Sequence, residues 1–248
     1  MPRAALAVLA LVPAGQPALA GDTPTVQNIL ERTGRVVENF VEQLSAVRCR
    51  EDVLQVKLAK NGRPQYKQET QYDSLLLIRL EGNDWSVEES RQPERQAGNG
   101  ANLPLLVTGG FAALAMIFHP YYQASFGFTK LEDEQIEGRA FLRVEFRHIP
   151  GTPSPAAYEL HGREYPLALT GTAWIHPETG AILRITTSLS GNMQDIGLRA
   201  LRSDVEYSPV TLTDALQPVW LPLRAIVDVE SLQQHWRNTH EFSGYRRF

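Results

Sequence analysis

The residues that could bind a metal ion or perform acid–base catalysis lie at spacings that suit neither task. Two imidazoles bind one ion from a helix when they are three or four residues apart, and no pair of histidines shows that spacing. No Gly-x-Ser-x-Gly turn presents a nucleophile, and Gly98-Asn99-Gly100 lacks the lysine and helix of a phosphate-binding loop. The sequence therefore predicts no metal site, no cofactor and no catalytic residue. The six histidines are His119, His148, His161, His176, His235 and His240.

The single cysteine and the acidic clusters do not indicate an enzyme either. Cys49 has no recognisable partner, so it is expected to be a small buried residue or an exposed bystander. Glu88-Glu89 and Glu132-Asp133-Glu134 lie in alternating or turn-like segments, which is typical of a solvated face. We therefore expect a protein that is not an enzyme. Two carboxylates and a histidine meeting in one cavity would instead favour a hydrolase.

The first 20 residues have the features of a cleavable export signal. Arg3 precedes an apolar run at positions 4–12, and Ala18-Leu19-Ala20 places small residues where a signal peptidase reads them. The run is too short for a membrane-spanning helix, which needs roughly 20 residues. We expect cleavage after Ala20 and a periplasmic mature chain, 21–248, that forms a single domain.

Composition and charge narrow the class of protein. The net charge of −4 and the lack of a basic block argue against nucleic acid as a partner. The hydrophobic fraction of 43% is that of an ordinary globular protein. Because one cysteine allows no intramolecular disulfide, stability must come from burial in a large core.

An amphipathic helix is predicted directly after the export signal. Thr23-Pro24 suits an N-cap followed by proline at the first helical position, and apolar residues then recur on one face up to about Val47. Burying such a face is worth roughly 10–20 kcal/mol before entropy, so another part of the chain must cover it. Gly34, which flanks the face, indicates a close backbone approach. The face consists of Val26, Ile29, Leu30, Val37, Phe40, Val41 and Leu44.

From Arg50 onward the apolar period changes from 3.6 to 2. Leu54, Val56 and Leu58 alternate with polar residues, and a strand over 65–80 returns after a turn at 60–62. That strand is long enough to require a large, strongly bent sheet. With loops at 92–102 and 150–166, the chain accommodates about eight to ten antiparallel strands. The predicted fold class is α+β, mostly antiparallel β, with a curved sheet wrapped around the N-terminal helix.

An apolar insertion at 103–128 interrupts the strands. Within it, 111–122 is predicted to form a short helix or helical turn that ends near Pro120. One interpretation is a lid over an acyl-chain cavity, with Gly109-Gly110 as its hinge. The other is a core plug that never moves, because long apolar insertions are more often packed than mobile.

Three stretches together resemble a known family: the export signal with its helix, the hairpin Trp174 to Arg184, and the strand Trp220-Leu221-Pro222-Leu223-Arg224 leading to the closing segment 242–248. They are similar to bacterial outer-membrane lipoprotein-sorting, or lipoprotein carrier, proteins. This resemblance implies an incomplete β-barrel whose concave apolar face is covered by helices and accepts acyl chains. It also implies an arginine on an early strand that helps to hold the lid closed. The candidates for that arginine are Arg48, Arg50 and Arg79.

The resemblance leads to one functional hypothesis and one alternative. The first is a monomeric periplasmic carrier that holds a lipid or lipidated protein without covalent chemistry and associates transiently with membranes. The alternative is an envelope-sensing or scaffold module that uses the same sheet to bind a polypeptide. Aromatic residues on strands are often ordinary packing, but they are also candidates for the ligand site. The predicted ligand-binding residues are Phe111, Leu114, Ile117, Phe118, Tyr121, Tyr122, Trp174, Trp220 and Trp236.

Overall fold

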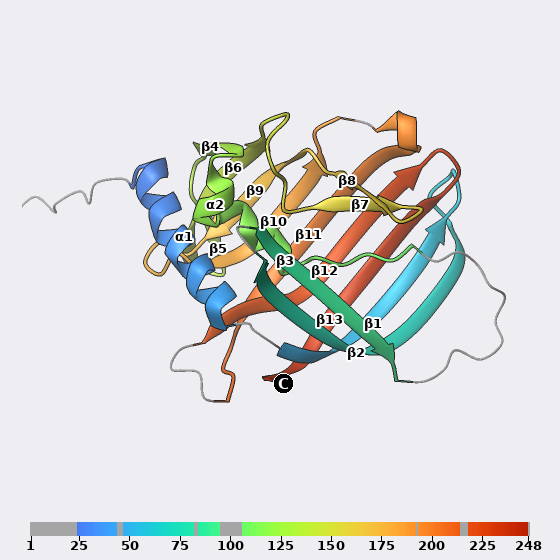
Figure 1. Ribbon diagram of the computed structural model, residues 1–248, viewed down its shortest axis with the longest axis horizontal. Helices are drawn as coiled ribbons and strands as arrows, with labels where there is room; N and C mark the ends of the chain where they lie inside the picture. Colours follow the sequence, from blue (N-terminus) through green and yellow to red (C-terminus); the bar gives the residue numbers. More distant parts are fainter. Residues whose placement is uncertain are drawn as a thin grey trace, which may run out of the picture.

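The computed structural model describes residues 24–43, 47–81, 84–94, 106–191, 193–213 and 218–247 (Figure 1). Most of these residues belong to one antiparallel sheet, which a few helices accompany. The predicted export signal and its cleavage site lie outside the described residues. The helices are α1 (Val26–Gln43), η1 (Ala113–Phe118), α2 (Pro120–Gln123) and η2 (Gln194–Ile196).

The main sheet has 11 strands in the order β3-β2-β1-β13-β12-β11-β10-β9-β6-β4, and β5 pairs with β6 beside this path. β1 pairs antiparallel with both β2 and β13, so the first and last strands are neighbours inside the sheet. β3 and β4 stand at the two ends of the order, so the sheet is not closed into a barrel. The strands are β1 (Val47–Leu58), β2 (Pro64–Glu81), β3 (Asp84–Pro93), β4 (Phe126–Lys130), β5 (Glu134–Ile136), β6 (Arg139–His148), β7 (Ala157–Leu160), β8 (Arg163–Pro166), β9 (Leu169–Ile175), β10 (Ile182–Leu189), β11 (Leu198–Val210), β12 (Val219–Ser231) and β13 (His235–Arg247).

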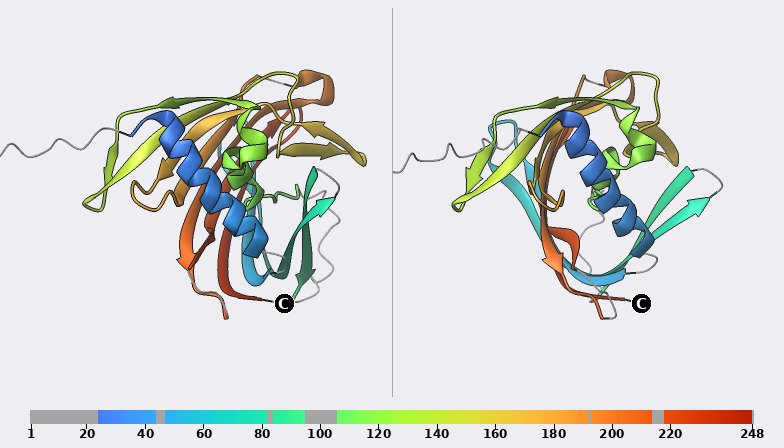
Figure 2. Two further views of the ribbon diagram at one scale, coloured as in Figure 1. Left: turned by 60° about the vertical axis from the view of Figure 1, so that its left-hand side comes forward. Right: turned by 90° about the vertical axis from the view of Figure 1, so that its left-hand side faces the viewer.

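The sheet is curved, and α1 lies on its concave side together with η1 and α2 (Figure 2). The long returning strand of the first hairpin is confirmed, since β2 runs for 18 residues. Strands of this length let one sheet bend around other elements, because each strand contributes its own twist along its length. The fold class, mostly antiparallel β with a few helices, is therefore confirmed.

Two details of the strand prediction are wrong. The described residues contain 13 strands rather than about eight to ten, because short strands such as β5 escape an argument from alternation. The segment 150–166, predicted as a loop, contains the two-stranded sheet β7-β8. His161 and Gly162 form its turn with φ of 53° and 74°, the left-handed geometry that a two-residue hairpin turn requires.

The amphipathic helix is confirmed as α1. Its apolar face packs against the insertion as well as against the sheet. Ile29, Val37, Phe40 and Val41 are buried, as the apolar stripe predicts, Val26 and Leu30 are half-buried, and Leu44 lies outside the described residues. The predicted end near Val47 is wrong, since α1 ends at Gln43 and Val47 begins β1. α1 packs against η1, α2 and β4. The sheet, the insertion and the helix therefore form successive layers, with the insertion in the middle.

Gly34 marks the close approach that its position in the sequence indicates. A Cβ atom at this position would lie 2.9 Å from Gln123 Nε2 and 3.3 Å from Pro120 Cγ. Gln123 Nε2 in turn donates hydrogen bonds to Leu30 O and Phe118 O, at 3.1 and 2.8 Å. Glycine thus lets α1 lie directly on the turn between η1 and α2.

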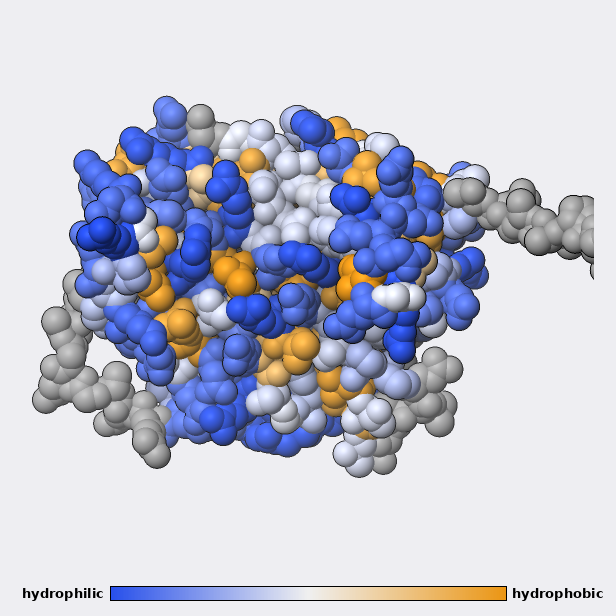
Figure 3. Space-filling view, turned by 180° about the vertical axis from the view of Figure 1, so that it is seen from behind, coloured by the Kyte–Doolittle hydropathy of each residue, from blue (hydrophilic) through white to orange (hydrophobic). Residues whose placement is uncertain are grey.

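Within the described part of the chain, no helix is long and apolar enough to cross a membrane. Seen from behind, the molecule is largely hydrophilic, and its hydrophobic residues lie in small groups between polar ones (Figure 3). Inside the molecule, residues from α1, the insertion and β4, β6 and β9–β12 form one core cluster.

Candidate functional site

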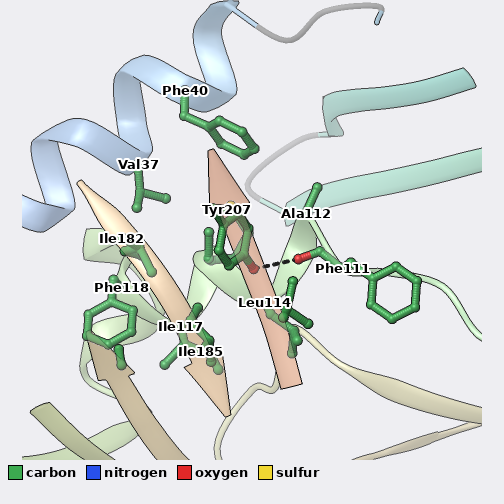
Figure 4. Close-up of a cluster of buried hydrophobic side chains, with 14 of the residues drawn as sticks. Val37, Phe40, Phe111, Ala112, Leu114, Ile117, Phe118, Ile182, Ile185 and Tyr207 are labelled. Carbon is green, nitrogen blue, oxygen red and sulfur yellow. Dashed lines mark hydrogen bonds between the residues drawn. The ribbon is translucent and has the colours of Figure 1, made fainter. Parts of the chain in front are cut away.

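The apolar insertion fills the concave side of the sheet. Every residue of η1 is buried, and Ile117 and Phe118 have no exposed surface. Figure 4 shows Ile117 beside Ile185 of β10, with Val37 and Phe40 of α1 above the cluster. Among the described residues, the chain itself thus occupies the concave side next to β10 and α1, and a ligand could enter there only if the insertion moved.

Burial of the insertion is energetically large. Phe111, Leu114, Met116, Ile117 and Phe118 are each at least 92% buried, since their exposed fractions run from 0% to 8%. At about 1.5–3 kcal/mol for each buried side chain, the five contribute roughly 8–15 kcal/mol before entropy. Displacing them into water is therefore unfavourable unless another apolar body takes their place.

Most of the predicted ligand-binding residues from the insertion lie together inside the sheet. Phe111, Leu114, Ile117, Phe118 and Tyr122 all belong to the core cluster. Tyr121, by contrast, is 41% exposed. Whether these residues contact a ligand stays a prediction.

The three tryptophans of the predicted site are dispersed. Trp220 packs partly buried against the core cluster. Trp236 is buried against Tyr66 and Lys57 at another part of the sheet, where its Nε1 donates to Gln234. Trp220 is thus the one of the two that packs against the cluster containing the insertion's aromatic side chains, and Trp236 lies outside that cluster.

Trp174 lies on the opposite face of the sheet from the core. Its neighbours Ala173 and Ile175 are fully buried in the core cluster, and side chains alternate along a strand. Its ring packs against the guanidinium groups of Arg143 and Arg184, at 5.7 and 5.0 Å from the ring centroid. Trp174 is therefore held by cation–π contacts rather than directed toward the insertion.

A buried charged cluster lies next to the insertion and was not foreseen from the sequence. Glu51 of β1 has no exposed surface, and its Oε1 accepts a hydrogen bond from His240 Nδ1 of β13 at 2.7 Å. Arg91 of β3 donates to both oxygens of Glu51, from Nε at 2.6 Å and from Nη2 at 2.9 Å. Ser74 Oγ of β2 donates to Glu51 Oε2 at 2.6 Å. Four strands thus contribute to one carboxylate.

The charge states of this cluster follow from burial and pairing. Burial opposes ionisation of Glu51, but hydrogen bonds from His240 and Ser74 and the charge of Arg91 outweigh it, so the pKa of Glu51 lies below its ordinary value. Burial also lowers the pKa of His240, against the opposing effect of Glu51. His240 is therefore neutral at pH 7, with a proton on Nδ1 and an acceptor at Nε2.

The charged cluster fastens the start of the insertion to the sheet. Arg91 Nη1 donates to Thr108 O at 2.7 Å, and Thr108 Oγ1 lies 2.7 Å from His240 Nε2, to which it donates. Glu89 of β3 accepts a hydrogen bond from the Gly110 backbone N–H at 2.9 Å. The insertion is thus held at 108–110 by side chains of β3 and β13.

Further polar contacts extend this fastening on either side of Thr108. Gln55 of β1 and Asn238 of β13 both donate to Leu106 O, at 2.7 and 2.9 Å. Tyr207 of β11 donates to Phe111 O at 2.7 Å (Figure 4). Main-chain carbonyls at the entrance of the insertion are therefore satisfied by side chains of the sheet rather than by strand pairing.

An arginine that is not among the three candidates from the sequence contacts the insertion. Arg48 forms an ion pair with Asp73, and Arg50 pairs with Asp52. The side chain of Arg79 lies outside the described residues. Among the described residues, Arg91 of the end strand β3 contacts the insertion through its hydrogen bond to Thr108 O.

The alternation of residues in β1 did contain a signal for the Glu51 cluster, but the face that the apolar residues predict to be buried is not the face that carries Glu51. The apolar residues Leu54, Val56 and Leu58 predict one buried face, whereas the structure buries the opposite one, which carries Glu51 and Gln55. Val47, Cys49 and Val53 alternate with the same period as Glu51 and Gln55, so these five residues share one face of β1. Two polar residues on a face with apolar neighbours could have indicated a buried polar cluster. That face can be buried because its polar side chains have partners: Glu51 is bonded by Ser74, Arg91 and His240, and Gln55 donates to Leu106 O.

A small cavity adjoins the charged cluster. It is lined on one side by Glu51, Glu89 and Arg91 and elsewhere mainly by apolar side chains, including Phe111 and Phe242. Its volume of about 40 Å³ leaves room for a few water molecules. This is well below the roughly 300–1,000 Å³ of a typical small-molecule site. Cys49 also lines it, and burial raises the pKa of its thiol to about 12, so this cysteine is not a thiolate nucleophile.

Glu51, His240 and Thr108 form a carboxylate–imidazole–hydroxyl series, which acyl-transfer enzymes also use. With Glu89 nearby, it is the grouping of two carboxylates and a histidine that would favour a hydrolase. The Thr108 hydroxyl donates to His240, as a nucleophile does in such a series, and it also accepts from Asn238 Nδ2 at 3.1 Å. His240 is only 1% exposed. The series as described is closed to a substrate and acts as a fastening.

Comparison with known proteins adds fold neighbours and no family assignment. No family model and no curated protein matches the sequence. Among solved structures, a DUF1329 family protein from Desulfovibrio piger is similar with a TM-score of 0.46 at 9% identity, covering 91% of this chain and 94% of the other. A putative outer membrane lipoprotein-sorting protein domain from Vibrio parahaemolyticus has a TM-score of 0.43 at 13% identity, covering 88% and 93%.

A third solved structure is the lipoprotein LppX from Mycobacterium tuberculosis, with a TM-score of 0.28 at 10% identity, covering 89% of this chain and 96% of the other. These neighbours include the type of protein that the sequence pattern resembles. At such identities and scores the similarity assigns no function to this chain.

Proposed function

We propose that the protein is an exported binding or carrier protein, which holds a lipid or the lipidated part of a protein without covalent chemistry. The ligand would lie between the concave side of the sheet and the apolar insertion. The observation that carries the proposal is the insertion itself: it covers an apolar inner surface, yet side chains of β1, β3, β11 and β13 fasten its entrance. Such an entrance can open while the strand pairing of the sheet stays intact.

Burying an acyl chain and burying the insertion's large side chains release free energies of similar size. A 16-carbon chain contributes on the order of 12 kcal/mol on burial, at about 0.8 kcal/mol for each CH₂ group. This is comparable with the roughly 8–15 kcal/mol of the insertion's five large side chains. Exchange of one for the other is therefore close to balanced, which is what a carrier needs in order both to load and to release.

Native mass spectrometry of the purified protein tests the proposal. We expect a co-purified lipid, and after delipidation we expect uptake of a fluorescent fatty acid. A protein that is persistently empty and takes up no fatty acid would refute a carrier function. A covalent acyl adduct on Thr108 after incubation with an activated ester would refute the non-covalent part.

Loosening the insertion should accelerate loading. Tyr207→Phe removes the hydrogen bond to Phe111 O, which is worth about 1 kcal/mol. We expect the variant to take up a fluorescent fatty acid roughly fivefold faster than the wild type. Tyr165→Phe, on the separate β7-β8 sheet, is the matched control and should load at the wild-type rate. Equal rates for all three proteins would show that the insertion does not limit access.

A second candidate function follows from the open sheet. β3 and β4 stand at the ends of the strand order, so either edge can pair with a strand from a polypeptide partner. A crosslinked protein partner that remains bound after delipidation would favour this envelope-sensing or scaffold function over the carrier function.

A further inference from the structure

The carboxylate of Glu89 occupies a position where hydrogen-bond donors converge at the edge of the cavity. Its Oε1 accepts the Gly110 backbone N–H at 2.9 Å, and its Oε2 lies 3.4 Å from Arg91 Nη2. Glu89 and Arg91 both line the cavity. One guanidinium and one main-chain amide thus bind a carboxylate that belongs to the protein itself.

The two residues beside this carboxylate, Gly109 and Gly110, are glycines and have no side chains. A Cβ atom at Gly109 would collide with Glu89 Oε2 and lie 3.4 Å from both terminal nitrogens of Arg91. Gly110 has a φ of 76°, the left-handed geometry that points its N–H toward the carboxylate and favours glycine. The Gly110 N–H is a fixed main-chain donor of the kind that binds anions.

Arg91 is held in place independently of Glu89. Two hydrogen bonds to Glu51 and one to Thr108 O fix its guanidinium. Its side chain is 16% exposed, whereas that of Glu51 is fully buried. Because Glu51 lies on the interior strand β1 and Glu89 on the end strand β3, Glu89 is the carboxylate that can leave. Its side chain is 24% exposed.

The rest of the cavity wall suits a hydrocarbon chain. Leu75 and Leu76 of β2, Phe111 and Ala112 of the insertion, and Phe242 of β13 line the same cavity. An anion position therefore lies directly beside an apolar surface that continues into the insertion. This juxtaposition matches an amphiphile with a carboxylate at one end.

We propose that the Glu89 position is the head-group site for the carboxylate of a long-chain fatty acid, and that Glu89 fills it in the empty protein. The inference rests on the proposed lipid-binding function and names its ligand class. A ligand carboxylate replaces one negative charge with another, so Arg91 remains shared between two carboxylates and no charge is left unpaired. Glu89 turns outward toward solvent when the ligand enters.

The test compares two ligands that differ only in the head group. Isothermal titration calorimetry at pH 8 measures binding of decanoate and of decanol, each below its aggregation limit, to the wild type and Glu89→Ala. We expect Glu89→Ala to bind decanoate about tenfold more tightly, a change of roughly 1.4 kcal/mol, because the ligand no longer displaces a side chain. Decanol, which has no carboxylate, should gain only what the lost hydrogen bond to Gly110 contributes, a clearly smaller factor than decanoate gains.

Two further variants keep the result interpretable. Glu69→Ala removes an acidic residue of the neighbouring strand β2, whose side chain is 71% exposed, and should leave both affinities unchanged. Glu89→Gln retains an acceptor for Gly110 without the charge, and should give a smaller gain for decanoate than Glu89→Ala. It replaces the alanine variant if that protein does not fold.

The outcomes separate this inference from the proposed function. If Glu89→Ala tightens both ligands equally, Glu89 only fastens the insertion and the head-group site is wrong. If decanoate affinity does not rise, the site is also wrong, while decanol binding still supports a lipid carrier. If neither ligand binds any of the proteins, the proposed function fails together with the inference.

Discussion

Glu51 and His240 are both buried, and Glu51 is charged whereas His240 is neutral. Glu51 is held as a carboxylate by its partners, and burial keeps His240 neutral. Removing His240 would leave a buried carboxylate without one of its hydrogen-bond donors, which costs at least about 1–3 kcal/mol. The pair therefore fastens the insertion only while its protonation pattern is preserved.

Acid should weaken this fastening through His240. Burial places the pKa of His240 in the folded protein below its ordinary value of 6.5, which the unfolded chain retains. As the pH falls below 6.5, the unfolded state binds a proton that the folded state does not. The free energy of unfolding then decreases by up to about 1.4 kcal/mol per pH unit, whereas above 6.5 this contribution is fully present.

Urea unfolding at pH 7.5, 6.5 and 5.5 checks this prediction. His240→Gln should be less stable than the wild type at pH 7.5 but lose less stability between pH 6.5 and 5.5. His161→Asn, at an exposed turn position with φ of 53°, should retain the wild-type pH dependence. Parallel pH profiles for the wild type and His240→Gln would contradict the assigned role of His240.

The contact between α1 and the insertion makes a prediction at the scale of elements. Gly34→Leu places a large side chain against Gln123, Pro120 and Phe118 O, where even a Cβ atom is crowded. Leucine favours helix, so the cost comes from overpacking and should be about 1–3 kcal/mol in the free energy of unfolding. Arg35→Leu, at the adjacent exposed position, is the control and should change stability by less than about 0.5 kcal/mol. Equal stability of both variants would show that α1 does not rest on the insertion.

Elements with strong local patterns were predictable from the sequence, and contacts between distant segments were not. The three-and-four spacing of α1 and the length of β2 follow from local periodicity and burial. The β7-β8 hairpin has only four residues in each strand, too few for alternation to stand out. Glu51, Arg91 and His240 are 40 or more positions apart, and their meeting depends on β1 lying between β2 and β13.

For the molecule as a whole, the central feature is an open sheet whose concave side is filled by a segment of the same chain. A fold stabilised only by its core would need no buried charges at the entrance of that segment, because buried ion pairs add little net stability. The proposed replacement of this fastened segment by a lipid would account for both features.

Hydrogen–deuterium exchange with and without a bound fatty acid tests this claim most directly. The account predicts that amides of 111–123 exchange faster than those of β11–β13 in the empty protein, because the segment opens without the sheet. Exchange of 111–123 should increase further when the fatty acid replaces it, while the strands stay unchanged. Protection of 111–123 equal to that of the strands, with and without lipid, would contradict the account.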